Sequence, residues 1–320
     1  MVINPVGTGV LLAANRIMTL GIVFGFITAI LNSVGYLVSA RYLLHYKSPL
    51  RLLIQAQVFM MVIALPFLIW LFPFGQIDKP LEFVGVQAFW VTVFLLGQGC
   101  FFAAQRYFEA SRLSSLLGLK IIVLAIVFVV SGKGMLNLWQ VTAVLMAAIA
   151  GMLFNWSGAA RSSLVGWLLV VATLFCYSFA DLSETELVMR VHASGHSLLR
   201  STFATAALAY TCLGAVSLPF IYRFRPTRDQ ACKVFPYSLI WITSQVSLFA
   251  CFAMIKPVFG NVILATRGLF SVLFGALLPF IGLASLDSKI SRRKWIQRGF
   301  AALLMALAIA VYSYGKSLQQ

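Results

Sequence analysis

The segment LLGLKIIVLAIVFVV, residues 116–130, has the composition of a membrane-spanning helix and is interrupted only by Lys120. The segment ILATRGLFSVLFGALLPF, residues 263–280, carries Arg267 in a similar setting. A cation inside such a run costs roughly 2.5–3.5 kcal/mol on membrane-insertion scales. Because the chain carries this cost twice, we expect both cations to face an internal cavity and to meet an anionic part of a substrate.

The two segments belong to an internal repeat. The constant shift that places Lys120 on Arg267 aligns further residues without a gap. These aligned pairs are Gln98 with Gln245, Phe102 with Phe249, Ala103 with Ala250, and Leu117 with Leu264. The chain therefore contains two related halves.

Composition indicates a polytopic membrane protein. Of the 320 residues, 61% are hydrophobic and 10% are charged, and the mean hydropathy is +0.96. A soluble domain carries about 25% charged residues. A bilayer-spanning helix needs about 20 apolar residues. The chain holds ten such runs: 17–40, 50–72, 86–107, 111–131, 136–155, 164–187, 197–222, 235–255, 258–283 and 294–314.

These runs are continuous rather than alternating, which favours helices over a barrel. We therefore predict an all-α integral membrane protein with ten transmembrane helices. Five helices fall in residues 1–160 and five in residues 161–320. An odd number of helices in each half gives the halves opposite senses in the membrane. This is the inverted-repeat plan of many secondary transporters, whose site lies at the midplane.

The sixth run is the most polar. It carries a stripe on one helical face, formed by Thr173, Tyr177, Asp181 and Glu184. An acidic residue at such depth is a functional hypothesis by default. The alternative is that Asp181 simply pairs with Lys120 or Arg267 and joins two helices. Both interpretations stay open, because a pair that forms and breaks can also act as a gate.

The first run carries a second polar stripe, formed by Thr28, Asn32, Tyr36 and Ser39. Small and polar side chains commonly form hydrogen bonds between membrane helices. The stripe therefore fits either such helix contacts or the lining of a cavity.

The chain combines a five-plus-five plan, short turns after the third and eighth helices, and the segment KPVFGNVILATRGLFSVLFG at residues 256–275. In these features it resembles the drug/metabolite transporter superfamily, in particular its EamA-like ten-helix carriers. The resemblance implies a central cavity, alternating access, and often proton coupling or exchange. Organic-phosphate exchangers of this superfamily use cationic residues in the cavity, and Arg267 is comparably placed, although their wider motif is not evident.

We therefore predict a secondary transporter for a small anionic or zwitterionic metabolite. Lys120 and Arg267 would neutralise a carboxylate or phosphate, which arginine can hold bidentately. Asp181 would bind an amine or, with Glu184, carry a coupling proton, because burial favours the neutral form of a carboxyl group. Orienting contacts would come from Asn32, Tyr36, Gln98, Tyr177 and Gln245.

Other functions remain as alternatives. A flippase for a phosphate-containing lipid-linked substrate would use the same cations, with the lipid tail left in the bilayer. An exporter of cationic drugs would need an acidic midplane, and only Asp181 supports it. No HExxH motif and no nucleophile–base pair is found, so no enzyme is predicted. His192 and His196 lack a third ligand nearby, so neither a metal nor another cofactor is expected.

The formal net charge of +16 lies mainly in the connections between helices. We relate it to orientation and to anionic lipid headgroups rather than to nucleic acid. Most of the 24 Lys and Arg follow odd-numbered helices, which would place the termini outside, whereas the family keeps them in the cytoplasm. The side of the membrane that the termini face is therefore not assigned. The expected location is a bacterial inner membrane, and a homodimer is one possible assembly.

Overall fold

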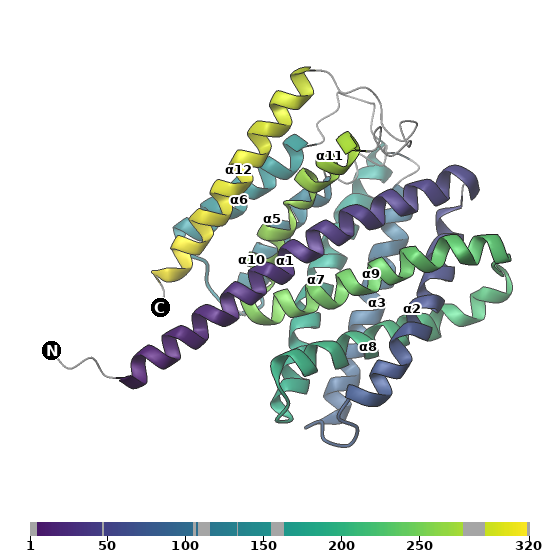
Figure 1. Ribbon diagram of the computed structural model, residues 1–320, viewed down its shortest axis with the longest axis horizontal. Helices are drawn as coiled ribbons and strands as arrows, with labels where there is room; N and C mark the ends of the chain where they lie inside the picture. Colours follow the sequence, from purple (N-terminus) through teal and green to yellow (C-terminus); the bar gives the residue numbers. More distant parts are fainter. Residues whose placement is uncertain are drawn as a thin grey trace.

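The computed structural model describes residues 5–46, 48–104, 107, 116–132, 134–154, 163–277 and 292–318. Within these ranges the chain is helical and forms no strand (Figure 1). Seven helices are long and apolar enough to cross a membrane, and three shorter apolar helices accompany them. The prediction of an all-α chain is confirmed, and the seven long helices indicate a multi-pass integral membrane protein.

The first half contains α1 (Pro5–Tyr46), α2 (Pro49–Leu71), α3 (Pro80–Ala104), α5 (Lys120–Val130) and α6 (Leu138–Phe154). The second half contains α7 (Leu164–Ala193), α8 (Leu198–Ser217), α9 (Arg228–Ile255), α10 (Pro257–Leu264), α11 (Arg267–Leu277) and α12 (Arg292–Ser317). Two short 3₁₀ turns, η1 (Leu117–Leu119) and η2 (Leu218–Tyr222), lie beside α5 and α8.

Local signals explain where several helices begin. Proline is the first residue of α2, α3 and α10, where its missing N–H would be unpaired in any case. The capping box formed by Thr227 and Gln230 starts α9 at Arg228. The apolar run had predicted a start at residue 235, so the basic connection before it is shorter than expected.

The helices pack in antiparallel or crossing pairs. α1 lies along α9, α2 along α8, α3 along α7, and α6 along α12. Figure 1 shows α6 and α12 at one edge of the molecule and α2 and α8 at the opposite edge. The core is accordingly divided: one cluster centres on α5, α6, α10 and α12, and another on α2, α3, α8 and the end of α7.

Glycine allows two of these pairs to approach closely. A Cβ atom at Gly214 of α8 would lie 2.2 Å from the Met61 Cβ and 2.7 Å from the Gln57 carbonyl oxygen, both on α2. A Cβ atom at Gly97 of α3 would lie 2.8 Å from the Tyr177 ring of α7. Small residues at such positions let membrane helices gain packing contacts.

Candidate functional site

The two aligned cations lie at matching interruptions of their helices. Lys120 is the first residue of α5, directly after the 3₁₀ turn η1. Arg267 is the first residue of α11, and two turn residues, Ala265 and Thr266, separate it from α10. The N-terminus of a helix carries partial positive charge, so each cation adds to a local field that attracts anions.

The break before Arg267 corrects the continuous helix predicted over 258–283. The Thr266 hydroxyl donates to the Ile263 carbonyl oxygen at 2.7 Å, and the Thr266 N–H donates to the same oxygen at 2.9 Å, so both hydrogen bonds stabilise the turn. An apolar run has the same composition whether its helix is continuous or broken, so hydropathy could not locate the turn. The part of this predicted run beyond residue 277 lies outside the described residues.

Lys120, Asp181 and Asn261 meet from α5, α7 and α10. The Lys120 Nζ lies 2.7 Å from the Asp181 Oδ2, and the Asn261 Nδ2 donates to the same oxygen at 2.7 Å. The side chains of Lys120 and Asp181 are only 14% and 7% exposed. Of the two cations considered for Asp181, the structure places Lys120 against it. The pair thereby neutralises two charges that are removed from water.

Glu184 lies one turn beyond Asp181 on the same helix and is 4% exposed. Its Oε1 atom is buried and has no hydrogen-bond partner in the structure. Asp181 and Lys120 are its charged neighbours. Burial of an unpaired carboxylate is costly, and such groups in membrane helices mark functional positions.

Arg267 differs from Lys120 in its charged surroundings. No carboxylate of the described residues lies within ion-pair distance of its guanidinium, which is half-buried. Its backbone carbonyl accepts a hydrogen bond from the Ser33 hydroxyl of α1 at 2.9 Å, which fixes the helix break against α1. Arg267 and Tyr177 are close enough to interact electrostatically, as are Tyr177 and Tyr36.

Aromatic rings surround this side of the site. Tyr36 packs edge-on against Trp241 at a centroid separation of 5.9 Å, and Trp241 stacks on Tyr237 at 5.7 Å. Tyr177 lies 6.1 Å from the Phe94 ring. Tyr237 and Trp241 did not figure among the predicted site residues, although their spacing of four places both on one face of α9.

The polar stripe of α1 joins helices. Ser244 Oγ of α9 donates to the Asn32 Oδ1 at 2.9 Å and contacts the Thr28 carbonyl oxygen at 3.2 Å. Asn32 therefore takes part in a contact between α1 and α9, as the packing interpretation predicted. The two glutamines that align in the internal repeat lie on separate helices. Gln98 is half-buried on α3, and Gln245 is buried on α9.

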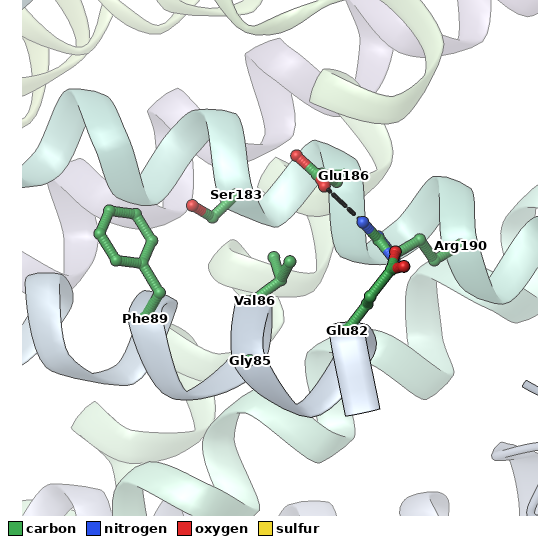
Figure 2. A pocket seen from close by; sticks show the side chains of 7 residues that line it. All are labelled: Glu82, Gly85, Val86, Phe89, Ser183, Glu186 and Arg190. Carbon is green, nitrogen blue, oxygen red and sulfur yellow. Dashed lines mark hydrogen bonds and ion pairs between the residues drawn. The ribbon is translucent and has the colours of Figure 1, made fainter. Parts of the chain in front are cut away.

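A hollow of about 410 Å³ lies between α3 and α7 (Figure 2), and neither Lys120 nor Arg267 lines it. Three charged side chains, those of Glu82, Glu186 and Arg190, line one end. The remainder is lined mainly by apolar residues, with one hydroxyl: Gly85, Val86, Phe89 and Ser183. None of the residues that line this hollow is among the site residues predicted from the sequence.

Comparison with known proteins supports the fold alone. No protein-family profile and no curated protein matches the chain. A solved structure titled "Crystal structure of protein" matches with a TM-score of 0.66 at 14% sequence identity. The match covers 94% of this chain and 99% of that one, so the likeness extends over the whole arrangement of helices.

Proposed function

We propose that this protein is a secondary transporter, an EamA-like carrier that moves a small anionic or zwitterionic metabolite by alternating access. The observation that carries the proposal is the pair of cations at matched helix breaks. Lys120 is neutralised by Asp181, whereas the Arg267 guanidinium has no carboxylate partner among the described residues. An unpaired, half-buried arginine beside tyrosine side chains fits a carboxylate or phosphate ligand.

The pattern of helix contacts supports two repeats, residues 1–160 and 161–320, with inverted orientation. In this arrangement each helix of the first repeat corresponds to one of the second: α1 to α7, α2 to α8, α3 to α9, α5 to α10–α11, and α6 to α12. Exchanging corresponding helices should therefore leave the set of helix contacts unchanged. The α1–α9 pair then becomes the α7–α3 pair, and the α5–α7 contact becomes the contact of α10–α11 with α1. The α2–α8 and α6–α12 pairs map onto themselves. Such symmetry is expected of a transporter whose halves rock around a shared site.

The same geometry suggests how binding and movement are coupled. An anion held by Arg267 would draw the Lys120 ammonium toward itself and away from Asp181. Asp181 and Glu184 would then form an acidic pair that binds either a coupling proton or the amino group of a zwitterion. The Lys120–Asp181 contact would thus form in the empty carrier and break in the loaded one, which is a differential contact of the kind a conformational change requires.

A ligand screen tests the proposal. Purified protein would be heated with amino acids, carboxylates, sugar phosphates, nucleotides and polyprenyl phosphates. A ligand present at 100 times its Kd stabilises a protein by about 2.7 kcal/mol, which shifts the unfolding temperature measurably. We expect an anionic or zwitterionic compound to stabilise wild type and to lose this effect in Arg267→Gln.

Arg200→Gln is the matched control, because the Arg200 side chain is exposed and donates to the Leu71 backbone carbonyl, away from Arg267. It should retain the full ligand-induced shift. Stabilisation by polyprenyl phosphate alone would favour the flippase. Stabilisation by organic cations that survives Arg267→Gln would refute the anion site.

A further inference from the structure

The cleft between α3 and α7 has a charged end and an apolar end (Figure 2). At the charged end, Arg190 of α7 contacts the Glu82 Oε2 at 3.2 Å and the Glu186 Oε1 at 2.9 Å. Lys79 contacts the other Glu82 oxygen at 3.1 Å. Among the described residues, two cations and two carboxylates therefore meet within one small cluster. A balanced set of this kind complements a zwitterion better than an anion or a cation.

These charged groups remain open to exchange. The side chains of Glu82 and Arg190 are 52% and 27% exposed, and Lys79 is 71% exposed. Ion pairs at such exposure contribute little to stability. A ligand that offered its own ammonium and phosphate could therefore replace them at small cost.

The other end of the cleft faces outward and is apolar. Phe89 of α3 and Phe179 of α7 meet edge-on with centroids 6.2 Å apart, and both are substantially exposed. On helices that cross a membrane, exposed apolar surface of this kind meets acyl chains.

The charged cluster also lies at the level expected for lipid headgroups. Glu82 is two residues from the start of α3, and Arg190 is in the last turn of α7. Glu82 and Phe89 are seven residues apart, which is about 10 Å along a helix. The cleft thus runs from the end of two membrane-spanning helices into the apolar region, as the upper part of a phospholipid does.

We propose that the cleft between α3 and α7 binds a zwitterionic phospholipid with a primary amine, of the phosphatidylethanolamine type. The carboxylates of Glu82 and Glu186 accept hydrogen bonds from the ammonium group. Arg190 and Lys79 bind the phosphate, and an acyl chain lies over Phe89 and Phe179. The site is separate from Lys120 and Arg267, so it does not depend on the proposed transport function.

Gly85 provides a direct test, because it lines the cleft and a Cβ atom there would meet nothing within 4 Å. Gly85→Leu should fill the cleft without disturbing the helices. Gly99→Leu is the matched control: it lies on the same helix, outside the cleft, and also has open space at its Cβ position. Delipidated full-length protein in detergent would be titrated with phosphatidylethanolamine, and bound lipid would be counted by native mass spectrometry.

We expect wild type and Gly99→Leu to bind the lipid with equal affinity. Gly85→Leu should bind it at least about tenfold more weakly, and a tenfold loss corresponds to about 1.4 kcal/mol. Equal binding by Gly85→Leu and Gly99→Leu would overturn the proposal. Phosphatidylglycerol binding as tightly as phosphatidylethanolamine would overturn the zwitterion assignment. Free phosphoethanolamine displacing the lipid at equal concentration would overturn the assignment to a lipid.

A second variant tests the headgroup without filling the cleft. Wild type should prefer phosphatidylethanolamine to phosphatidylcholine, because the choline nitrogen has no N–H to donate. The double variant Glu82→Gln and Glu186→Gln should lose this preference while keeping its gel-filtration profile. A preference that persists in the double variant would show that the carboxylates do not hold the ammonium.

Discussion

Two lysine–aspartate pairs of this protein have similar distances and different surroundings. The Lys120–Asp181 pair is 2.7 Å long, with side chains 14% and 7% exposed. The Lys233–Asp229 pair is 2.9 Å long, with side chains 42% and 65% exposed. Breaking a buried pair leaves a charge without compensation, whereas an exposed charge is solvated again by water. Distance alone therefore does not determine what each pair contributes.

This contrast gives a prediction for the free energy of unfolding. Lys120→Met should lower it by about 3 kcal/mol, because Asp181 would keep only its hydrogen bond from Asn261. Lys233→Met should lower it by less than about 1 kcal/mol. Unfolding in mixed micelles, followed by circular dichroism, measures both values. Equal effects of the two substitutions would contradict the burial of the pair.

The double substitution Lys120→Met with Asp181→Leu provides the control for the buried pair. Removing both charges should restore most of the lost stability, because no uncompensated charge remains. A double variant as unstable as Lys120→Met alone would mean that the loss comes from packing rather than from charge.

Part of the candidate site could be predicted from single residues of the sequence. The spacing along α7 predicted that Asp181 and Glu184 share a face, and both are buried. The sequence did not show which cation meets Asp181, because Lys120 and Arg267 lie in apolar segments that align with each other. That choice depends on how α5, α7 and α10 are placed side by side, which is a property of the packed molecule.

At the scale of helices, close approach at glycine controls the α2–α8 pair. Gly214→Ala should lower the free energy of unfolding by about 1–3 kcal/mol, because its methyl group would overlap Met61 and the Gln57 carbonyl. Gly99→Ala on α3 has open space and should be neutral or raise it by up to about 1 kcal/mol through helix propensity. Thermal unfolding of the two variants in detergent compares them. A neutral Gly214→Ala would rule out the close contact.

The junction of α9 and α10 stores backbone strain. Lys256 has φ of 74° and ψ of 152°, a conformation that is favourable only for glycine. Lys256→Gly should therefore raise the free energy of unfolding by about 1 kcal/mol. Lys256→Ala removes the same side-chain charge without relieving the strain and should not raise it. Chemical unfolding of both variants separates the two effects, and equal changes would exclude strain as their cause.

Helix ends were predicted less well than helix interiors. The start of α10 at Pro257 lies within one residue of the predicted run, which begins at residue 258, because proline marks the helix start directly. The start of α9 was placed too late, although Thr227 and Gln230 carry the spacing of a capping box. The breaks before Lys120 and Arg267 were not predicted, because hydropathy averages over a whole span and is insensitive to a two-residue turn.

For the whole molecule, the repeat plan predicts which connections share a side of the membrane. Five spans separate Ser163 from Ser317, so these two positions should face opposite sides. Each would be replaced by cysteine in a background that lacks the five native cysteines. A membrane-impermeant maleimide added to intact cells should label one variant and not the other. Labelling of both from the same side would contradict five spans in the second half.

For the whole molecule, the proposed transport function requires that the transported anion reaches Arg267. The direct measurement is counterflow in proteoliposomes, using the anion that most strongly stabilises the purified protein. Liposomes loaded with unlabelled anion should accumulate the labelled form through wild type and Arg200→Gln. Arg267→Gln should reduce the initial rate by about a hundredfold, which corresponds to about 2.7 kcal/mol of lost interaction. Undiminished counterflow through Arg267→Gln would show that this arginine does not bind the transported anion.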